Sequence, residues 1–119
     1  MSKKILVVDD EPMLREILKD FLEMGSYKVE EAHNGHEAFK MIGQSSFDCV
    51  ISDVRMPNGD GTELAKNIFN MQGAKPKVFL ATGFSDISDE QAKSLGVEKV
   101  LHKPFDYNEL LNAIRKAIG

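Results

Sequence analysis

The sequence predicts a single α/β domain in which helices cover both faces of a five-stranded parallel sheet. Short, unbroken apolar runs, typical of strands buried on both faces, alternate five times with longer segments whose apolar residues recur at helical spacing. Successive parallel strands need a crossover, usually a helix, so the alternation itself indicates a parallel sheet. The length of 119 residues suits one domain covering 1–119, and an apolar fraction of 42% is that of an ordinary globular chain.

The first strand is predicted at residues 5–8, where four apolar residues stand together. A helix follows, because Pro12 suits a first helical turn and Gly25 suits a helix end. The helix has its apolar residues spaced to lie on one face: Leu14, Ile17, Leu18, Phe21 and Leu22.

A second strand is predicted at residues 27–32. Asn34 and Glu37 then have the spacing of a capping box, which predicts that a helix opens there and runs to Gly43. A third strand covers residues 49–52 and ends at an aspartate.

The second half of the chain repeats this pattern. A helix is predicted at residues 62–71, with an apolar stripe of Leu64, Ala65, Ile68 and Phe69. A strand at 78–81, a weaker helix at 88–95 closed by Gly96, and a short strand at 99–102 follow.

A last helix is predicted after strand 99–102, because Asp106 and Glu109 have capping-box spacing. Its apolar face comprises Leu110, Leu111, Ile114, Ala117 and Ile118. Two strand orders suit five such units, Rossmann-like and flavodoxin-like 2-1-3-4-5, and five strands of this length favour the second.

In either order, ligands bind beyond the carboxyl ends of the strands. The residues that stand there are Asp9 and Asp10 after the first strand, Asp53 after the third, Thr82 after the fourth and Lys103 after the fifth. In the flavodoxin-like order the first and third strands are neighbours, so the three carboxylates should share one cleft.

Three carboxylates so close together cannot all stay ionised without compensating charge, and one lysine does not supply enough. Mg²⁺ would supply it, because it binds one or two carboxylates together with waters and a phosphate. A carboxylate can itself accept a phosphoryl group, whose oxygens then need a metal, a cation and a hydroxyl donor. The strand-end residues offer this whole set.

Four segments carry a resemblance to a known family: residues 7–12, 52–57, 81–83 and 103–105. Together they resemble the signature segments of receiver domains of two-component response regulators (CheY-like), in the same order and along the whole chain. The resemblance implies that Asp53 is the phosphoacceptor. It also implies that Asp10, Asp53 and the backbone carbonyl of Arg55 ligate Mg²⁺, while Asp9 acts through metal-bound water.

The same resemblance implies that Lys103 contacts the phosphoryl oxygens and that Thr82 moves its hydroxyl toward them. A cis Lys103–Pro104 bond is expected, since it aims the lysine into the cleft. The phosphoryl donor would be a phosphohistidine on a sensor histidine kinase or phosphotransfer domain. The chain departs from the family at Val100, where receivers often carry Tyr or Phe as partner of the threonine.

We expect the signal to reach an unknown downstream protein near this valine, through Phe84, Ile87, Lys99, Val100, His102 and Tyr107. Val100 is β-branched and short, so it cannot switch as an aromatic does. The segment 83–89 and its weak following helix are expected to carry the change instead. Phe84 and Arg55 could also shield the phosphoryl group from water.

Other features exclude function classes. The net charge of -4 argues against direct nucleic-acid binding. The first apolar run is too short for a signal peptide or membrane span, so a cytoplasmic protein without membrane insertion is expected. One cysteine, Cys49, excludes an internal disulfide. The function expected is signalling and not enzymatic turnover, in a stand-alone receiver or a piece of a longer regulator.

Several alternatives stay open. Asp9 and Asp10 could merely cap the next helix, and Asp53 could merely begin a turn. A phosphatase of the haloacid-dehalogenase type uses similar groups, but its nucleophile follows the first strand in an Asp-x-Asp pattern. A flavin carrier would need hydroxyls and amides where this chain has acidic residues. A receiver-like scaffold would not need all five site residues.

Overall fold

The computed structural model describes residues 2–83 and 87–119, and its strands form one parallel sheet in the order β2-β1-β3-β4-β5. The predicted flavodoxin-like order is therefore confirmed. The strands are β1 (Lys4–Val8), β2 (Lys28–Ala32), β3 (Cys49–Asp53), β4 (Lys77–Thr82) and β5 (Val97–His102). The helices are α1 (Pro12–Met24), α2 (Gly35–Gln44), α3 (Gly61–Phe69), α4 (Asp89–Ser94) and α5 (Tyr107–Ile118).

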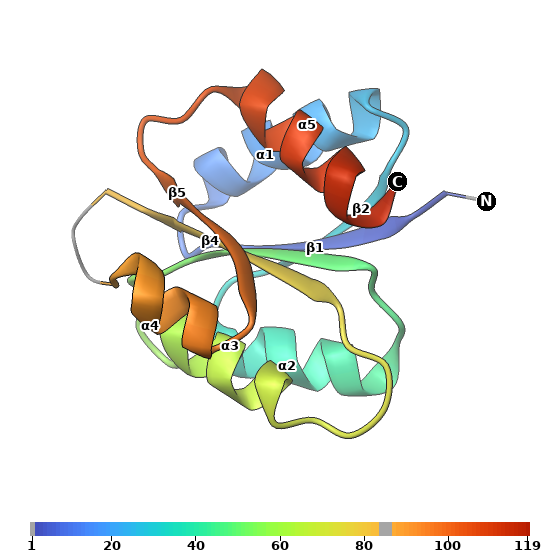
Figure 1. Cartoon of the computed structure of the whole chain (residues 1–119). Helices are drawn as coiled ribbons and strands as arrows, with labels where there is room; N and C mark the ends of the chain where they lie inside the picture. The colour runs from blue at the N-terminus through green and yellow to red at the C-terminus, as the bar shows by residue number, and fades with distance from the viewer. Residues whose placement is uncertain (1, 84–86) are drawn as a thin grey trace.

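Helices cover both faces of the sheet: α1 and α5 lie on one side, and α2, α3 and α4 on the other (Figure 1). The position of β1 between the two helical layers explains why its apolar run is unbroken. Ile5 and Val7 belong to the core beneath α1 and α5, whereas Leu6 and Val8 belong to the core beneath the other three helices. A strand with a helical layer on each face must be apolar at every position. None of the helices in the described parts of the chain is long and apolar enough to cross a membrane.

The predicted helix starts are correct for α2 and only partly correct for α5. The Asn34 side chain accepts a hydrogen bond from the Glu37 amide at 2.8 Å, and the Glu37 carboxylate accepts one from the His33 amide at 2.9 Å. At α5, Asp106 caps the Asn108 amide at 2.7 Å. The expected capping-box partner Glu109 instead pairs with Lys99 in the middle of β5, whose ammonium lies 3.1 Å from the Glu109 carboxylate.

Three residues assigned to apolar stripes are less buried than predicted. Leu14 and Ile17 of α1 are 39% and 45% exposed, and Leu14 lines an open cavity at the carboxyl edge of the sheet. Phe69, the last residue of α3, is 48% exposed. Its ring lies against Gly96 and beneath the Lys75 ammonium, which is 5.4 Å from the ring centre.

The start of α2 is fixed to the loop that follows β3. The Gly35 amide donates a hydrogen bond to the Gly59 carbonyl at 2.8 Å, and a Cβ on Gly35 would lie 2.6 Å from that oxygen. Gly43, in the same helix, has no atom within 4 Å of such a Cβ. Only the first of these two glycines is therefore required by the packing.

We predict opposite effects from the same substitution at these two glycines. Gly35→Ala should destabilise the protein by about 1–3 kcal/mol, the usual cost of overpacking. Gly43→Ala should stabilise it by up to about 1 kcal/mol, because alanine favours the helical backbone. Urea unfolding of both variants measures the difference, and equal effects of both substitutions would contradict the close approach at Gly35.

Candidate functional site

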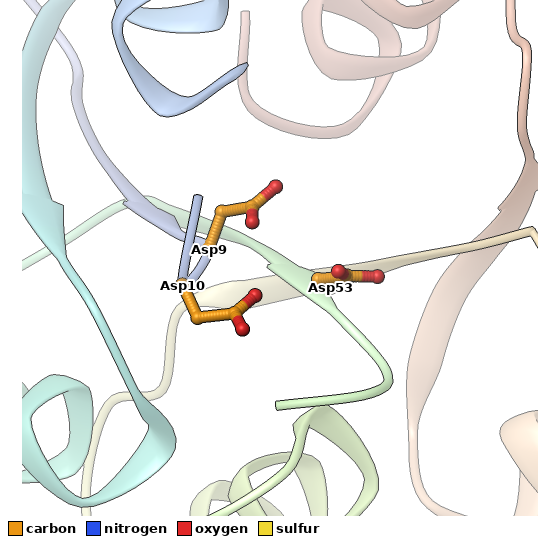
Figure 2. A group of neighbouring side chains, drawn as sticks. All are labelled: Asp9, Asp10 and Asp53. Atoms are coloured by element: carbon orange, nitrogen blue, oxygen red, sulfur yellow. The ribbon is translucent and has the colours of Figure 1, made fainter. Parts of the chain in front are cut away.

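Three carboxylates gather at the carboxyl edge of the sheet. Asp9 and Asp10 follow β1, and Asp53 is the last residue of β3. Because β1 pairs directly with β3, with Val8 opposite Ser52, the two strand ends are neighbours. One carboxylate oxygen from each aspartate lies within 4.8 Å of the other two, and Figure 2 shows the three side chains beside one another at the ends of β1 and β3. The structure therefore brings together the three carboxylates that were predicted to meet at this edge.

The segment after β1 turns sharply, and this turn gives the Asp9 and Asp10 side chains different environments. The Asp9 carboxylate accepts a hydrogen bond from the Glu11 amide at 2.9 Å, and its side chain is only 13% exposed. The Asp10 side chain is exposed. The N-cap of α1 is Glu11, which makes no side-chain cap bond, so neither aspartate serves as the cap of that helix. Asp9 does, however, accept the amide of the N-cap residue Glu11 at the start of that helix.

Lys103 brings one positive charge to these carboxylates. Its Nζ lies 3.5 Å from Asp53 Oδ1 and 4.0 Å from Asp9 Oδ2. Its amide donates to the Thr82 carbonyl at 2.8 Å, which aligns the end of β5 with β4. The Lys103–Pro104 bond is cis, as expected from the sequence. One ammonium against three carboxylates leaves the cluster with excess negative charge.

Asp53 is the aspartate whose acidity is altered most clearly by this environment. Burial raises its pKa because removal from water disfavours the charged form. The Lys103 ammonium opposes that shift, and the Asp9 carboxylate adds to it. The net result is a raised pKa, so the ionised Asp53 carboxylate is held at a free-energy cost in the metal-free protein.

A stability difference should follow from this raised pKa. The folded state binds the Asp53 proton more tightly than the unfolded chain, so the stabilisation is present at low pH and is lost as pH rises through the raised pKa. Asp53→Asn should therefore raise the melting temperature of the metal-free protein at pH 7. The gain should shrink when the pH falls below the ordinary aspartate pKa.

Thermal unfolding across pH, in the presence of a chelator, tests this expectation. Asp20→Asn, at an exposed position of α1, is the matched control for loss of one carboxylate. An equal gain from both variants, or a gain from Asp53→Asn that grows in acid, would contradict the assignment.

The remaining two predicted site residues, Thr82 and Arg55, stand at the end of β4 and two residues beyond the end of β3. Thr82 ends β4, is 1% exposed and is aligned with His102 across the β4–β5 pair. Arg55 follows Asp53 by two residues and is exposed. The loop from the end of β3 to the start of α3 is tight. The Gly61 amide donates to the Val54 carbonyl at 2.9 Å, and a Cβ on Gly61 would clash with the Asp53 carbonyl.

The residues predicted to form an output surface are not all brought together. Lys99, Val100 and His102 line one groove beside α4. Ile87 is 5% exposed and belongs to the core with Ala92, because it precedes the N-cap Ser88 and packs as a hydrophobic staple. As a surface residue it was predicted wrongly. Phe84 lies outside the described residues.

Tyr107 also lies apart from that groove. Its ring centre is 5.2 Å from that of Phe21 and 5.6 Å from that of Phe105, on the side of α1 and α5. It lines an apolar cavity of about 470 Å³ whose polar rim includes Asp9, Asp53 and Lys103. Sequence patterns did not predict this cavity, because its walls come from segments that only the tertiary fold brings together.

Comparison with known proteins agrees with this geometry. The family model described as "Response regulator receiver domain" matches residues 5–115. The chain belongs to this family, whose members act in two-component phosphorelay signalling. The class of protein is thus a receiver domain with the CheY-like order of strands.

Particular relatives extend the comparison. The response regulator GtcR of Aneurinibacillus migulanus is 37% identical over 97% of this chain and 47% of its own length. The transcriptional regulatory protein SrrA of Staphylococcus aureus is 29% identical over the same shares. The chain therefore spans about half the length of these curated relatives.

Solved structures are similar over nearly the whole chain. A CheY-like receiver domain protein from Methanospirillum hungatei has a TM-score of 0.89 at 27% identity, covering 99% of this chain and 94% of that one. The response regulator TrrA from Thermotoga maritima has a TM-score of 0.86 at 36% identity, covering 97% and 98%. TrrA was solved in complex with Mg²⁺-BeF.

Proposed function

We propose that this receiver is switched by phosphorylation of Asp53 in the presence of Mg²⁺. The observation that carries the proposal is the gathering of Asp9, Asp10 and Asp53 within 4.8 Å, with the Lys103 ammonium 3.5 Å from Asp53. Asp53 is the central member, since its carboxylate lies nearer the ammonium than that of Asp9 and it stands on the middle strand of the sheet. This arrangement suits transfer of a phosphoryl group to a carboxylate.

The donor in this proposal is a phosphohistidine of a sensor histidine kinase or phosphotransfer domain. One Asp53 carboxylate oxygen forms the new P–O bond while the P–N bond of the donor breaks. The imidazole nitrogen leaves with the electron pair of that bond. The Lys103 ammonium is placed to attract the phosphoryl oxygens as their negative charge is redistributed.

The residues present fit a magnesium ion. Mg²⁺ prefers oxygen ligands. Three carboxylates against one ammonium leave an excess of negative charge, which a divalent cation would neutralise. Asp10, Asp53 and the Arg55 carbonyl would hold the ion, with Asp9 acting through water. When bound, the ion neutralises charge on carboxylates and phosphoryl oxygens alike.

The start of α1 is the surface we assign to the donor. Met13, Leu14 and Ile17 are exposed apolar residues there, and Leu14 lines the cavity that reaches Asp53. Contiguous apolar side chains on the surface of a monomer mark contact sites for partners. A donor domain bound at this end of α1 would bring its phosphohistidine toward the strand ends.

The output surface in this proposal is the groove beside α4, including Lys99, Val100 and His102. Thr82 is buried and aligned with His102 of this groove, so a shift of the Thr82 hydroxyl toward a phosphoryl group would alter this edge of the sheet. Val100 is half-buried and packs against the core, which leaves the segment before β5 to respond. Amide chemical shifts with and without beryllofluoride test this, and silence at residues 87–102 would refute it.

The decisive experiment for the proposed function is chemical. Incubation of the protein with acetyl phosphate and Mg²⁺, followed by mass spectrometry, should locate one added phosphoryl group on Asp53. A phosphoryl group on another residue would overturn the assignment. Multiple turnovers of a generic phosphate monoester would favour a phosphatase instead, although the central carboxylate of Asp53 ends β3 and does not follow β1.

A further inference from the structure

Arg15 of α1 reaches back to the acidic segment that begins the site. Its Nη1 donates a hydrogen bond to the Asp9 carbonyl at 2.7 Å, and its Nε lies 3.3 Å from Glu31 Oε1 of β2. The Arg15 side chain is only 16% exposed. The guanidinium therefore connects the turn after β1 to the neighbouring strand in a partly buried position.

The carbonyl that Arg15 contacts has a particular place in the chain. The Asp9 amide donates to the Ala32 carbonyl at 3.2 Å, and the pairing of the β1 segment with β2 ends at this hydrogen bond. The Asp9 carbonyl belongs to the next peptide unit, which joins Asp9 to Asp10. Because a peptide unit is planar, fixing this carbonyl fixes the plane from whose two ends both carboxylates project.

We propose that Arg15 is a positioning residue for the magnesium site: it orients the Asp9–Asp10 peptide so that both carboxylates face Asp53. The planar guanidinium suits this task, since it can donate to a carbonyl and a carboxylate at the same time in fixed geometry. Glu31 holds the guanidinium in place. The inference rests on the proposed function, because it concerns the ion that Asp10 and Asp53 would bind.

The effect of Arg15 as a charge is opposite to its effect as a positioning group. A positive charge near three carboxylates repels a cation, so removal of that charge alone should strengthen Mg²⁺ binding. Loss of the bond to the Asp9 carbonyl should weaken Mg²⁺ binding, because the ligands lose their orientation. The sign of the change therefore separates the two roles.

The chain offers a matched control in Lys19. This lysine lies one turn further along α1, carries the same charge, and pairs with the other oxygen of the same Glu31 at 3.7 Å. Its ammonium has no bond to the Asp9 carbonyl among the contacts of residues 2–83 and 87–119. Lys19→Gln thus removes the charge and weakens the link to Glu31 but leaves the positioning bond.

The experiment is an NMR titration with Mg²⁺, following the amide signals of Asp9, Asp10 and Asp53. Arg15→Gln should bind Mg²⁺ about tenfold more weakly than the wild type. This is the lower end of the loss in affinity that is usual when a group that orients a metal ligand is removed. Lys19→Gln should bind with unchanged or higher affinity. Arg15→Lys keeps the repelling charge but cannot serve both partners in the fixed geometry of the guanidinium, so its affinity should fall below that of the wild type.

The outcomes are distinguishable. Equal or tighter binding by Arg15→Gln, or equal weakening by Arg15→Gln and Lys19→Gln, would overturn the positioning role. If Arg15→Gln does not fold, as judged by thermal unfolding without metal, the affinity of Arg15→Lys becomes the deciding measurement, and a wild-type value would overturn the inference. A wild type that binds no Mg²⁺ would overturn the magnesium site itself and this inference with it.

Discussion

Asp53→Asn is expected to abolish labelling by acetyl phosphate and Mg²⁺. An amide oxygen is a poor nucleophile toward phosphorus and cannot form a stable acyl phosphate, so the substitution removes the reacting group while keeping its shape. Asp53 lies at the end of β3, with its side chain 16% exposed and the Lys103 ammonium 3.5 Å away. No other carboxylate of the site shares both features, since Asp10 is exposed and Asp9 Oδ2 is 4.0 Å from that ammonium.

Asp60→Asn is the matched control for this experiment. Asp60 caps α3 by accepting a hydrogen bond from the Glu63 amide at 2.8 Å, and asparagine caps a helix nearly as well. The control removes a carboxylate from the same loop without changing its structure, and it should be labelled as fast as the wild type. Labelling of Asp53→Asn at the wild-type rate would refute the phosphoacceptor assignment.

The second large effect concerns the metal. Asp10→Asn should weaken Mg²⁺ binding by about tenfold or more, which corresponds to about 1.4 kcal/mol. The exposed Asp10 carboxylate is available to an ion, and replacing it with an amide removes a full negative charge from the ligand set. Asp9→Asn should weaken binding less, because the Asp9 carboxylate is already engaged with the Glu11 amide and faces Lys103.

Isothermal titration calorimetry measures both affinities, and Asp20→Asn on the exposed part of α1 controls for net charge. Thermal unfolding adds a second readout. Mg²⁺ should raise the melting temperature of the wild type by binding the folded state, and this rise should be smaller in Asp10→Asn at the same Mg²⁺ concentration. An unchanged affinity in Asp10→Asn would rule out its role as a direct ligand.

The sequence determined the architecture and the membership of the site because both are written in local patterns. Runs such as 5–8 are apolar at every position only when both faces of a strand are covered, so the sheet with helices on both faces could be predicted. The strand ends then placed Asp9, Asp10 and Asp53 at one edge, since the carboxyl ends of parallel strands meet there.

Local sequence patterns predicted the place of a side chain less well where a contact outside the pattern decides it. Asp106 and Glu109 have capping-box spacing, but Glu109 pairs with Lys99 across the α5–β5 contact. Ile87 was expected on the output surface, yet it precedes the N-cap Ser88 and lies in the same core cluster as Ala92. In both cases the outcome depends on a neighbour that is remote in the sequence or on burial that spacing does not show.

Only the tertiary structure decided how the site is held and how its charges interact. The bond from Arg15 to the Asp9 carbonyl, the raised pKa of Asp53 and the apolar cavity beside it all depend on distances between separate segments. Electrostatic interactions and desolvation vary with distance and burial, and neither quantity is encoded in the identity of a single residue. The sequence therefore determined which groups meet, and the packing of α1, β2 and the β5–α5 loop around them decided their orientation and acidity.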